Sequence, residues 1–359
     1  MTEEPMSDQT PAPEPAEDGS FIERLSSSLR GYFLIEGSPI PLGIYRILLG
    51  LTIMYEAHHN FRRIAFYTPD TFHFPYVGFI KPLPIGDLPR RIPADDVLWA
   101  ALEQLAWPDT IEMLFTWQFV FATMLMLGLL TRVGALGVLM TQGYALFICQ
   151  LNFRNHIYLT LLCVLLILFS PAGRALSLDD GFKRVYEWLL PDKKRQTPEW
   201  VPLMTQRLIG IQIAMMYFWA TTHKLSPGFL SGYPMGRAVS RAITRARPAS
   251  WLFSPEQLQQ LSEFFADPQW QPLLAYMTVF AEGFLAVGLF FRSTRLAAVC
   301  IGIGLHFGIF LMMDIHTFGM LSVSAYICFW VPRARPIPIA GLPTPRLKSP
   351  GAPKEAAEA

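Results

Sequence analysis

Charged residues are scarce in this chain, and its cysteines form no pattern. Asp, Glu, Lys and Arg make up 16% of the residues, against roughly 25% in a typical soluble domain, and the formal net charge is +1. This composition argues against an ordinary soluble enzyme, and no nucleic acid partner is expected because there is no basic block. The four cysteines form no CxxC pair, which argues against a disulfide framework and a thiolate metal site.

Long hydrophobic runs dominate instead, since 52% of the 359 residues are hydrophobic. A membrane-spanning helix needs about 20 mostly apolar residues, because the hydrocarbon core of a bilayer is roughly 30 Å thick. We therefore predict an all-α polytopic membrane helix bundle with about eight transmembrane helices, and with interfacial helices in the outer loops. The predicted spans are 40–57, 111–130, 133–151, 155–170, 204–224, 271–291, 295–313 and 318–331.

Composition divides the chain into three parts. Residues 1–20 are Pro-rich and acidic and cannot bury enough apolar surface to fold, so we predict a disordered tail. All the apolar runs lie within residues 21–333, which we predict to form one membrane domain. Residues 334–359 are again rich in Pro and Ala, and we predict a second disordered tail.

Lys and Arg are unevenly distributed between the two sides of the predicted bundle. They are more frequent on the side of the N-terminus, which includes TR at 131–132, RSTR at 292–295 and a basic run within 171–203. An excess of these residues marks the cytoplasmic side. We therefore predict a multi-pass protein of the cell inner (plasma) membrane with both termini in the cytoplasm.

An arginine stripe lies in residues 225–270, a connection on the predicted outer side. Arg237, Arg241 and Arg245 recur every four residues in RAVSRAITRAR. This spacing predicts a helix that lies in the membrane interface, with its arginines against lipid headgroups or another anion.

Ionisable side chains gather near the outer ends of the predicted spans. In this orientation Glu56, the pair Asn155 and His156, and the pair His223 and Lys224 all lie at or near the outer boundary. We interpret them as a candidate proton-handling site. Two alternatives stay open: Lys224 snorkels to lipid phosphate, or His156 is a hydrogen-bonded packing residue.

Two more ionisable residues lie within predicted spans: Glu282 in VFAEGFLAVG and His306 in GIGLHFG. A charge at this depth costs at least ~2.5–3.5 kcal/mol, so each needs a partner or a role. Either Glu282 pairs with a residue such as Arg46, or it supports the site; a weaker alternative is a proton-coupled transporter that uses both residues. No HxxxH or HExxH spacing occurs, and no metal is expected.

Three stretches resemble one known family. They are NHIYL at 155–159, KLSPGFLSGYPM at 224–235 after the aromatic helix end MMYFWATT, and FHFPYVGFIKPLP at 72–84. Together with FRSTR at 291–295, they resemble the membrane domain of vitamin K-dependent gamma-carboxylases. This domain is also called the HTTM (horizontally transferred transmembrane) domain, and it occurs in many bacterial proteins. The resemblance covers about residues 21–333.

The resemblance implies an activity and a cofactor. In the family, the lysine of the KL motif is the catalytic base that deprotonates a reduced quinone, and the NH histidine positions or stabilises reaction species. These roles fall on Lys224 and His156. A lysine is a base only when neutral, and an apolar pocket favours that form. The chain departs from the family at His223, where a second lysine is usual, and at Phe229, where a tryptophan is usual.

Two functions follow as hypotheses. The first is a quinol-dependent epoxidase or carboxylase of the carbon–carbon lyase class, which uses a reduced, vitamin K-like quinone on the outer side of the membrane. The second is a non-enzymatic protein that handles lipids or peptides and helps the export or maturation of a partner peptide. In both, the lipid bilayer is a partner, and a peptide is a candidate substrate.

Overall fold

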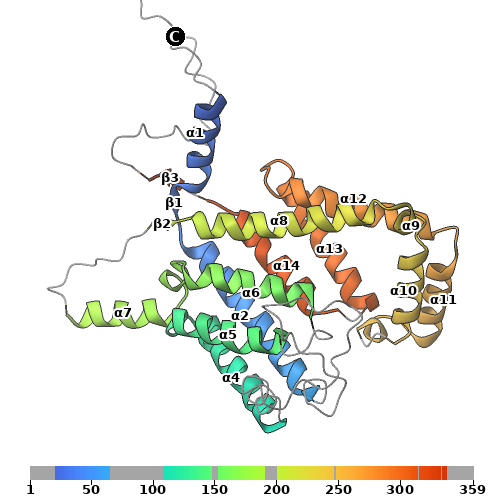
Figure 1. The fold of residues 1–359 in the computed structure, drawn as a ribbon, viewed down its shortest axis with the longest axis horizontal. Coiled ribbons are helices and arrows are strands. Elements are labelled where there is room, and N and C mark those ends of the chain that lie inside the picture. The colour runs from blue at the N-terminus through green and yellow to red at the C-terminus, as the bar shows by residue number, and fades with distance from the viewer. Residues whose placement is uncertain are drawn as a thin grey trace, which may run out of the picture.

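The chain folds into a bundle of helices with one small sheet (Figure 1). The computed structural model describes residues 21–64, 108–147, 153–190, 200–245, 248–313, 315–332 and 334–337. Our expectations for residues 1–20 and for the stretch 72–84 lie outside the described residues. The apolar helices are α2 Ile40–Phe61, α4 Pro108–Leu127, α5 Thr131–Phe147, α6 Asn155–Leu168, α8 Met204–Lys224, α12 Gln271–Gly288, α13 Arg295–Met313 and α14 Thr317–Ala325. The remaining helices of the described residues are α1 Phe21–Phe33, α7 Leu178–Leu189, α9 Pro227–Leu230, α10 Tyr233–Ile243 and α11 Pro255–Ala266, with 3₁₀ turns η3 Ala172–Arg174, η4 Ala249–Trp251 and η5 Tyr326–Phe329.

Each of the eight predicted spans contains a helix, which confirms the all-α prediction. The helices α8 and α13 have the predicted bounds, 204–224 and 295–313. By length and composition, two described helices, α2 and α13, are long and apolar enough to cross a bilayer, and three other apolar segments are shorter. The number of helices that cross the membrane therefore stays a prediction.

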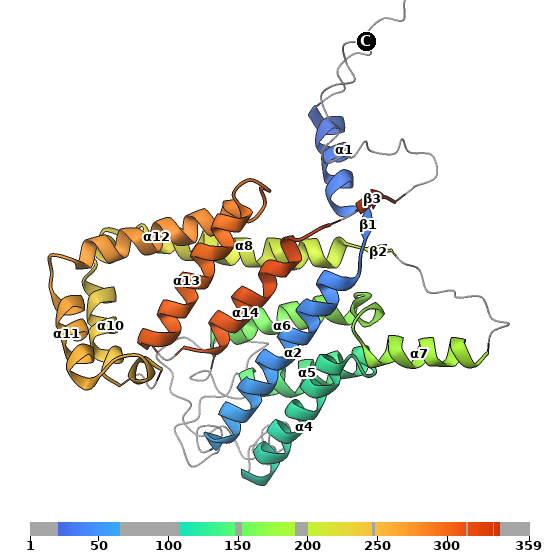
Figure 2. The same ribbon diagram turned by 180° about the vertical axis from the view of Figure 1, so that it is seen from behind.

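The helix α2 runs through the core of the bundle. It packs against α4 and α14, while α8 packs along α12 (Figure 2). Leu42, Tyr45, Leu49 and Ile53 on α2 are all fully buried. Their spacing of three and four residues places them on one face of the helix, as expected for a helix that buries an apolar stripe.

Large apolar side chains also cover the outside of the bundle. Met140, Phe280 and Leu296 are 68%, 70% and 75% exposed. Soluble monomers rarely expose apolar side chains over such a wide surface, whereas hydrocarbon tails accept them without cost. The described bundle thus has the surface of a membrane protein.

A buried arginine on α2 caps the C-terminal end of α4. Arg46 on α2 is 0% exposed, and its Nη1 donates hydrogen bonds to the carbonyl oxygens of Leu125 and Met126 at 2.6 and 2.8 Å. Its Nη2 donates to the carbonyl oxygen of Leu176 at 2.6 Å. The last carbonyls of a helix have no partner within that helix, and the guanidinium supplies one. The helix ends three residues before the predicted bound at residue 130, because Gly128 leaves the helical conformation with a φ of 66°.

Three short strands join distant parts of the chain. β1 Ile35–Gly37 lies between β2 Val201–Pro202 and β3 Ala334–Pro336, and both pairings are antiparallel. Ordered structure therefore extends past the predicted boundary at residue 333, because backbone pairing with β1 holds residues 334–336. We call this end of the bundle the sheet end and the opposite end the far end.

Short helices lie across the far end of the bundle. The helices α10 and α11 lie across the ends of α8 and α12 (Figure 1). The predicted helix with the arginine stripe is thus confirmed as a helix, α10, while its position in a membrane interface stays a prediction. Gly232, which precedes it, has a φ of 75° and lies directly against the backbone of Gln271. This close approach to α12 leaves no room for a Cβ atom at residue 232.

Candidate functional site

The predicted site residues form two groups at the far end of the bundle. The helices α2 and α8 both begin beside strands of the sheet and run away from it, so Glu56 and Lys224 lie near their distal ends. The 21 residues of α8 span about 30 Å at about 1.5 Å per residue. Asn155 and His156 open α6, which starts at the same far end.

Lys224 and Glu282 form an ion pair. The Nζ atom of Lys224 lies 2.5 Å from both carboxylate oxygens of Glu282. The side chains are 27% and 8% exposed, so the pair is largely removed from solvent. The ring of Phe229 has its centroid 5.9 Å from Nζ, a cation–π contact. The aromatic residue that replaces the family tryptophan therefore still covers the lysine.

This ion pair bears on two alternatives from the sequence, namely the pairing of Glu282 with Arg46 and the snorkelling of Lys224. Glu282 is bound by Lys224, while the guanidinium of Arg46 is bound to backbone carbonyls, so the pairing of Glu282 with Arg46 is wrong. The physical reason is that α8 packs along α12 and brings Lys224 to Glu282. The ammonium group also points to a carboxylate in the bundle, which is not the snorkelling geometry.

A buried hydrogen-bond cluster lies beside this pair. Tyr217 Oη lies 2.6 Å from His306 Nε2 and 2.6 Å from Tyr326 Oη. These three side chains are 1%, 3% and 5% exposed. His306 Nδ1 is also buried, and it has no hydrogen-bond partner. Tyr217 precedes Lys224 by two helical turns, so both lie on one face of α8.

Sequence reasoning missed both tyrosines of this cluster. A tyrosine in an apolar run counts as a core residue, and the hydroxyl group by itself gives no periodic signal. For Tyr217 the sequence offered one signal, because a spacing of seven residues places it on the same helix face as Lys224. Nothing in the sequence indicated Tyr326, whose position depends on how η5 packs against α8.

His156 lies between two cavities of different character. The larger cavity has a volume of about 520 Å³ and a polar lining that includes Glu56, Arg63, Arg154 and His156. Within this lining, Arg154 Nη1 lies 3.2 Å from Glu56 Oε1. The rest of its lining is Tyr55, His59, Asn155, Ile315, His316, Thr317 and Phe318.

The smaller cavity has a volume of about 170 Å³ and lies between α6 and α8. Its lining is mainly apolar and includes Leu159, Leu162 and Met216 beside His156. The Nε2 atom of His156 is buried without a hydrogen-bond partner. A buried polar atom without a partner is unusual in a folded protein, and it is a place where a bound molecule can donate or accept a hydrogen bond.

Phe318 lies between the two groups. Its ring centroid is 6.3 Å from that of His156 and 5.2 Å from that of His306. Lys224 lines neither of the two cavities at His156 described above. The structure thus brings His156 and His306 to the same phenylalanine, and His306 to Tyr217, while Lys224 is bound to Glu282.

The other predicted site residues are on the surface. His223 is exposed, and its Nδ1 lies 2.9 Å from the carbonyl oxygen of Trp219. Asn155 is exposed as well. Arg237, Arg241 and Arg245 are exposed on α10 and just past its end. Among the described residues, no group of three His, Cys, Asp or Glu side chains could hold a metal ion.

Comparison with known proteins identifies the family. The family model described as the HTTM domain matches residues 97–333, which is well over half of the chain. The matched region includes Lys224, Glu282, His156 and His306, and it ends between η5 and β3. No solved structure matches the chain. The match agrees with the resemblance carried by the NHIYL and KLSPGFLSGYPM stretches, and with a bundle whose outer surface is apolar. The chain therefore belongs to the HTTM domain family and is a membrane protein.

Proposed function

We propose that this protein is a quinol-dependent enzyme of the vitamin K-dependent gamma-carboxylase type, with Lys224 as its catalytic base. It spans the inner (plasma) membrane several times, with both termini in the cytoplasm and the site near the outer side. The observation that carries the proposal is the ion pair between Lys224 and Glu282, which is largely removed from solvent and covered by Phe229.

The ion pair supports a base at Lys224 for a physical reason. A lysine accepts a proton only after it has lost its own. Both oxygens of Glu282 lie 2.5 Å from Nζ, so the ammonium proton has an acceptor within hydrogen-bond distance. When a bound substrate excludes water from the pair, transfer of this proton to Glu282 leaves a neutral amine, because two charges without water are costly. The neutral amine of Lys224 then takes the proton of a substrate hydroxyl.

The residues near His156 fit a quinone ring. The apolar cavity is lined by Leu159, Met216 and His156, and the buried Nε2 of His156 has no hydrogen-bond partner that would compete with a quinone oxygen. When bound, a reduced quinone supplies an acidic hydroxyl group and the reaction with oxygen. The role of His156 is to hold that oxygen through a hydrogen bond. The hydrogen bond between Tyr217 and His306 fixes the ring of His306 against Phe318, which also contacts His156.

The test is an activity assay on the purified full-length protein in lipid vesicles. The substrate is a chemically reduced menaquinone, and the product is its epoxide, with incorporation of labelled bicarbonate into a Glu-containing peptide as a second readout. Lys224→Arg is the sharpest variant, because arginine keeps the ion pair with Glu282 and stays protonated. We expect Lys224→Arg and Lys224→Ala to lose about 10²–10⁴-fold in rate, the usual contribution of a general base.

A matched control is Arg245→Ala, which removes an exposed cation near the same end of the bundle. It should retain the wild-type epoxidation rate. If Lys224→Arg formed epoxide at the wild-type rate, Lys224 would not be the base.

A second candidate function is peptide or lipid handling without catalysis. The exposed arginines Arg237, Arg241 and Arg245 favour it, because they form a cationic face for an acidic peptide. Under this hypothesis, replacement of the three arginines stops maturation of the partner peptide in cells, while Lys224→Arg has no effect. The opposite pattern supports the enzyme.

A further inference from the structure

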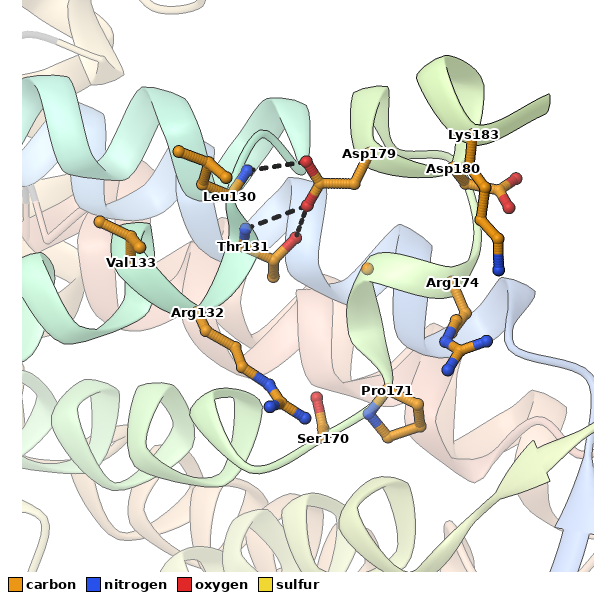
Figure 3. Close-up of a pocket in the computed structure, with 11 residues that line it drawn as sticks. Leu130, Thr131, Arg132, Val133, Ser170, Pro171, Arg174, Asp179, Asp180 and Lys183 are labelled. Atoms are coloured by element: carbon orange, nitrogen blue, oxygen red, sulfur yellow. Dashed lines mark hydrogen bonds between the residues drawn. The ribbon is translucent and has the colours of Figure 1, made fainter. Parts of the chain in front are cut away.

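Another cavity of about 520 Å³ lies near the sheet end of the bundle (Figure 3). Its residues Ser170 and Pro171 follow the end of α6, whereas His156 lies at the start of that helix. The cavity is formed where the turn between α4 and α5 meets η3 and the start of α7. Its lining includes Thr131, Arg132, Ser170, Arg174 and Lys183. Neither the sequence motifs nor the proposed reaction gives these residues a role.

Three cations from three segments line this cavity. Arg132 comes from α5, Arg174 from η3 and Lys183 from α7, and all three are exposed. Among the described residues, none of the three forms an ion pair. Figure 3 shows no interaction between these cations and the carboxylates of the cavity. Three cations that form no ion pair are thus held around one space.

The two carboxylates of the cavity are already bound elsewhere. Asp179 accepts hydrogen bonds from the backbone N–H groups of Leu130 and Thr131 at 2.9 and 3.2 Å, and so caps the start of α5 (Figure 3). Asp180 Oδ2 lies 2.6 Å from Nη2 of Arg184. The carboxylates are therefore balanced by a helix N-terminus and by a fourth cation, and the cavity keeps a positive charge.

An exposed apolar helix face adjoins the cavity. Phe182, Val185 and Leu189 on α7 are 63%, 56% and 61% exposed and recur with a spacing of three and four residues. Lys183 and Arg184 lie on the opposite, polar face of the same helix. An amphipathic helix next to the ends of apolar helices has the polarity of the boundary between lipid headgroups and acyl chains.

We propose that this cavity binds the phosphate group of an anionic phospholipid, with the apolar face of α7 against its acyl chains. Arg132, Arg174 and Lys183 contact the phosphate from three sides. The charge of the cavity selects an anionic lipid over a zwitterionic one, because each Lys or Arg near the surface favours an anionic lipid. The site does not depend on the chemistry at Lys224.

The test measures lipid binding to the purified full-length protein by native mass spectrometry. The protein in detergent is titrated with phosphatidylglycerol or with phosphatidylcholine, and retained lipid is counted. We expect wild type to prefer phosphatidylglycerol. Arg132→Gln, Arg174→Gln and Lys183→Gln should each lower its affinity about fivefold, as expected for one surface cation. Arg174→Lys should keep the preference.

Arg292→Gln is the matched control, because Arg292 is also exposed, lies in the turn between α12 and α13, and does not line the cavity. It should bind phosphatidylglycerol like wild type. The unfolding temperature of each variant is measured as well, so that weaker lipid binding is counted only for a variant that is folded.

Three results would overturn the proposal. One is wild-type binding of phosphatidylglycerol by all three glutamine variants. Another is equal binding of the two lipids by wild type. The third is full displacement of the lipid by excess inorganic phosphate, which would show that the cavity is a site for a free anion.

Discussion

Replacement of Arg46 by leucine should destabilise the bundle more than loss of any exposed arginine. Arg46 is fully buried, and its guanidinium donates three short hydrogen bonds, of 2.6, 2.8 and 2.6 Å, to backbone carbonyl oxygens. These bonds tie α2 to the end of α4 and to the segment after η3. Arg46→Leu keeps most of the buried apolar contacts of the stem. It leaves the carbonyl oxygens of Met126 and Leu176 without a donor, while that of Leu125 keeps the N–H of Gly128 at 3.2 Å.

The magnitude follows from the two carbonyls that lose their donor. A buried acceptor without a partner costs about 1–3 kcal/mol, which gives about 2–6 kcal/mol for two. Release of the buried charge offsets part of this loss, because a buried guanidinium carries its own desolvation penalty. We therefore expect Arg46→Leu to lower the free energy of unfolding by about 2–4 kcal/mol. At about 2–4 °C per kcal/mol, the unfolding temperature falls by about 4–16 °C.

The assay is thermal unfolding of the detergent-solubilised protein, followed by tryptophan fluorescence and by the loss of the monodisperse peak in size-exclusion chromatography. Arg46→Lys should recover part of the stability, since an ammonium group donates three hydrogen bonds but lacks the width of a guanidinium. Arg292→Leu, at an exposed position, should stay within about 0.5 kcal/mol of wild type. Equal unfolding temperatures for Arg46→Leu and wild type would refute the reasoning.

Two further stability changes follow from the structure. Asp179→Ala should lower the free energy of unfolding by about 1 kcal/mol, because the N–H groups of Leu130 and Thr131 lose their cap, and thermal unfolding would detect it. An unchanged unfolding temperature would mean that water replaces the carboxylate at no cost. Gly232→Ala should cost more than about 1 kcal/mol, because φ is 75° and a Cβ atom would meet the backbone of Gln271. Its control is Gly228→Ala, where a Cβ atom meets nothing within 4 Å, and equal stability of both variants would contradict the steric argument.

The stretch KLSPGFLSGYPM shows what a sequence motif can and cannot predict. Its resemblance to the family made Lys224 the candidate base, and the match of the family model over residues 97–333 agrees with that resemblance. The stretch does not reveal that Gly232 is required by the approach of α12 or that Phe229 covers the amine. These contacts join residues of different helices, so no local pattern contains them.

The positions of the eight apolar helices were determined by the sequence itself, because a run of about 20 apolar residues forms its hydrogen bonds within its own segment and is bounded by charged turns. The partners of the buried polar groups were decided only by the tertiary structure. Glu282 lies 58 residues from Lys224, and Tyr217 lies 89 residues from His306. Their pairing depends on which helices are neighbours and on how each is rotated about its axis, and hydrophobicity along one helix contains neither. The same reason explains Arg46, whose carbonyl partners exist only after α4 has ended beside α2.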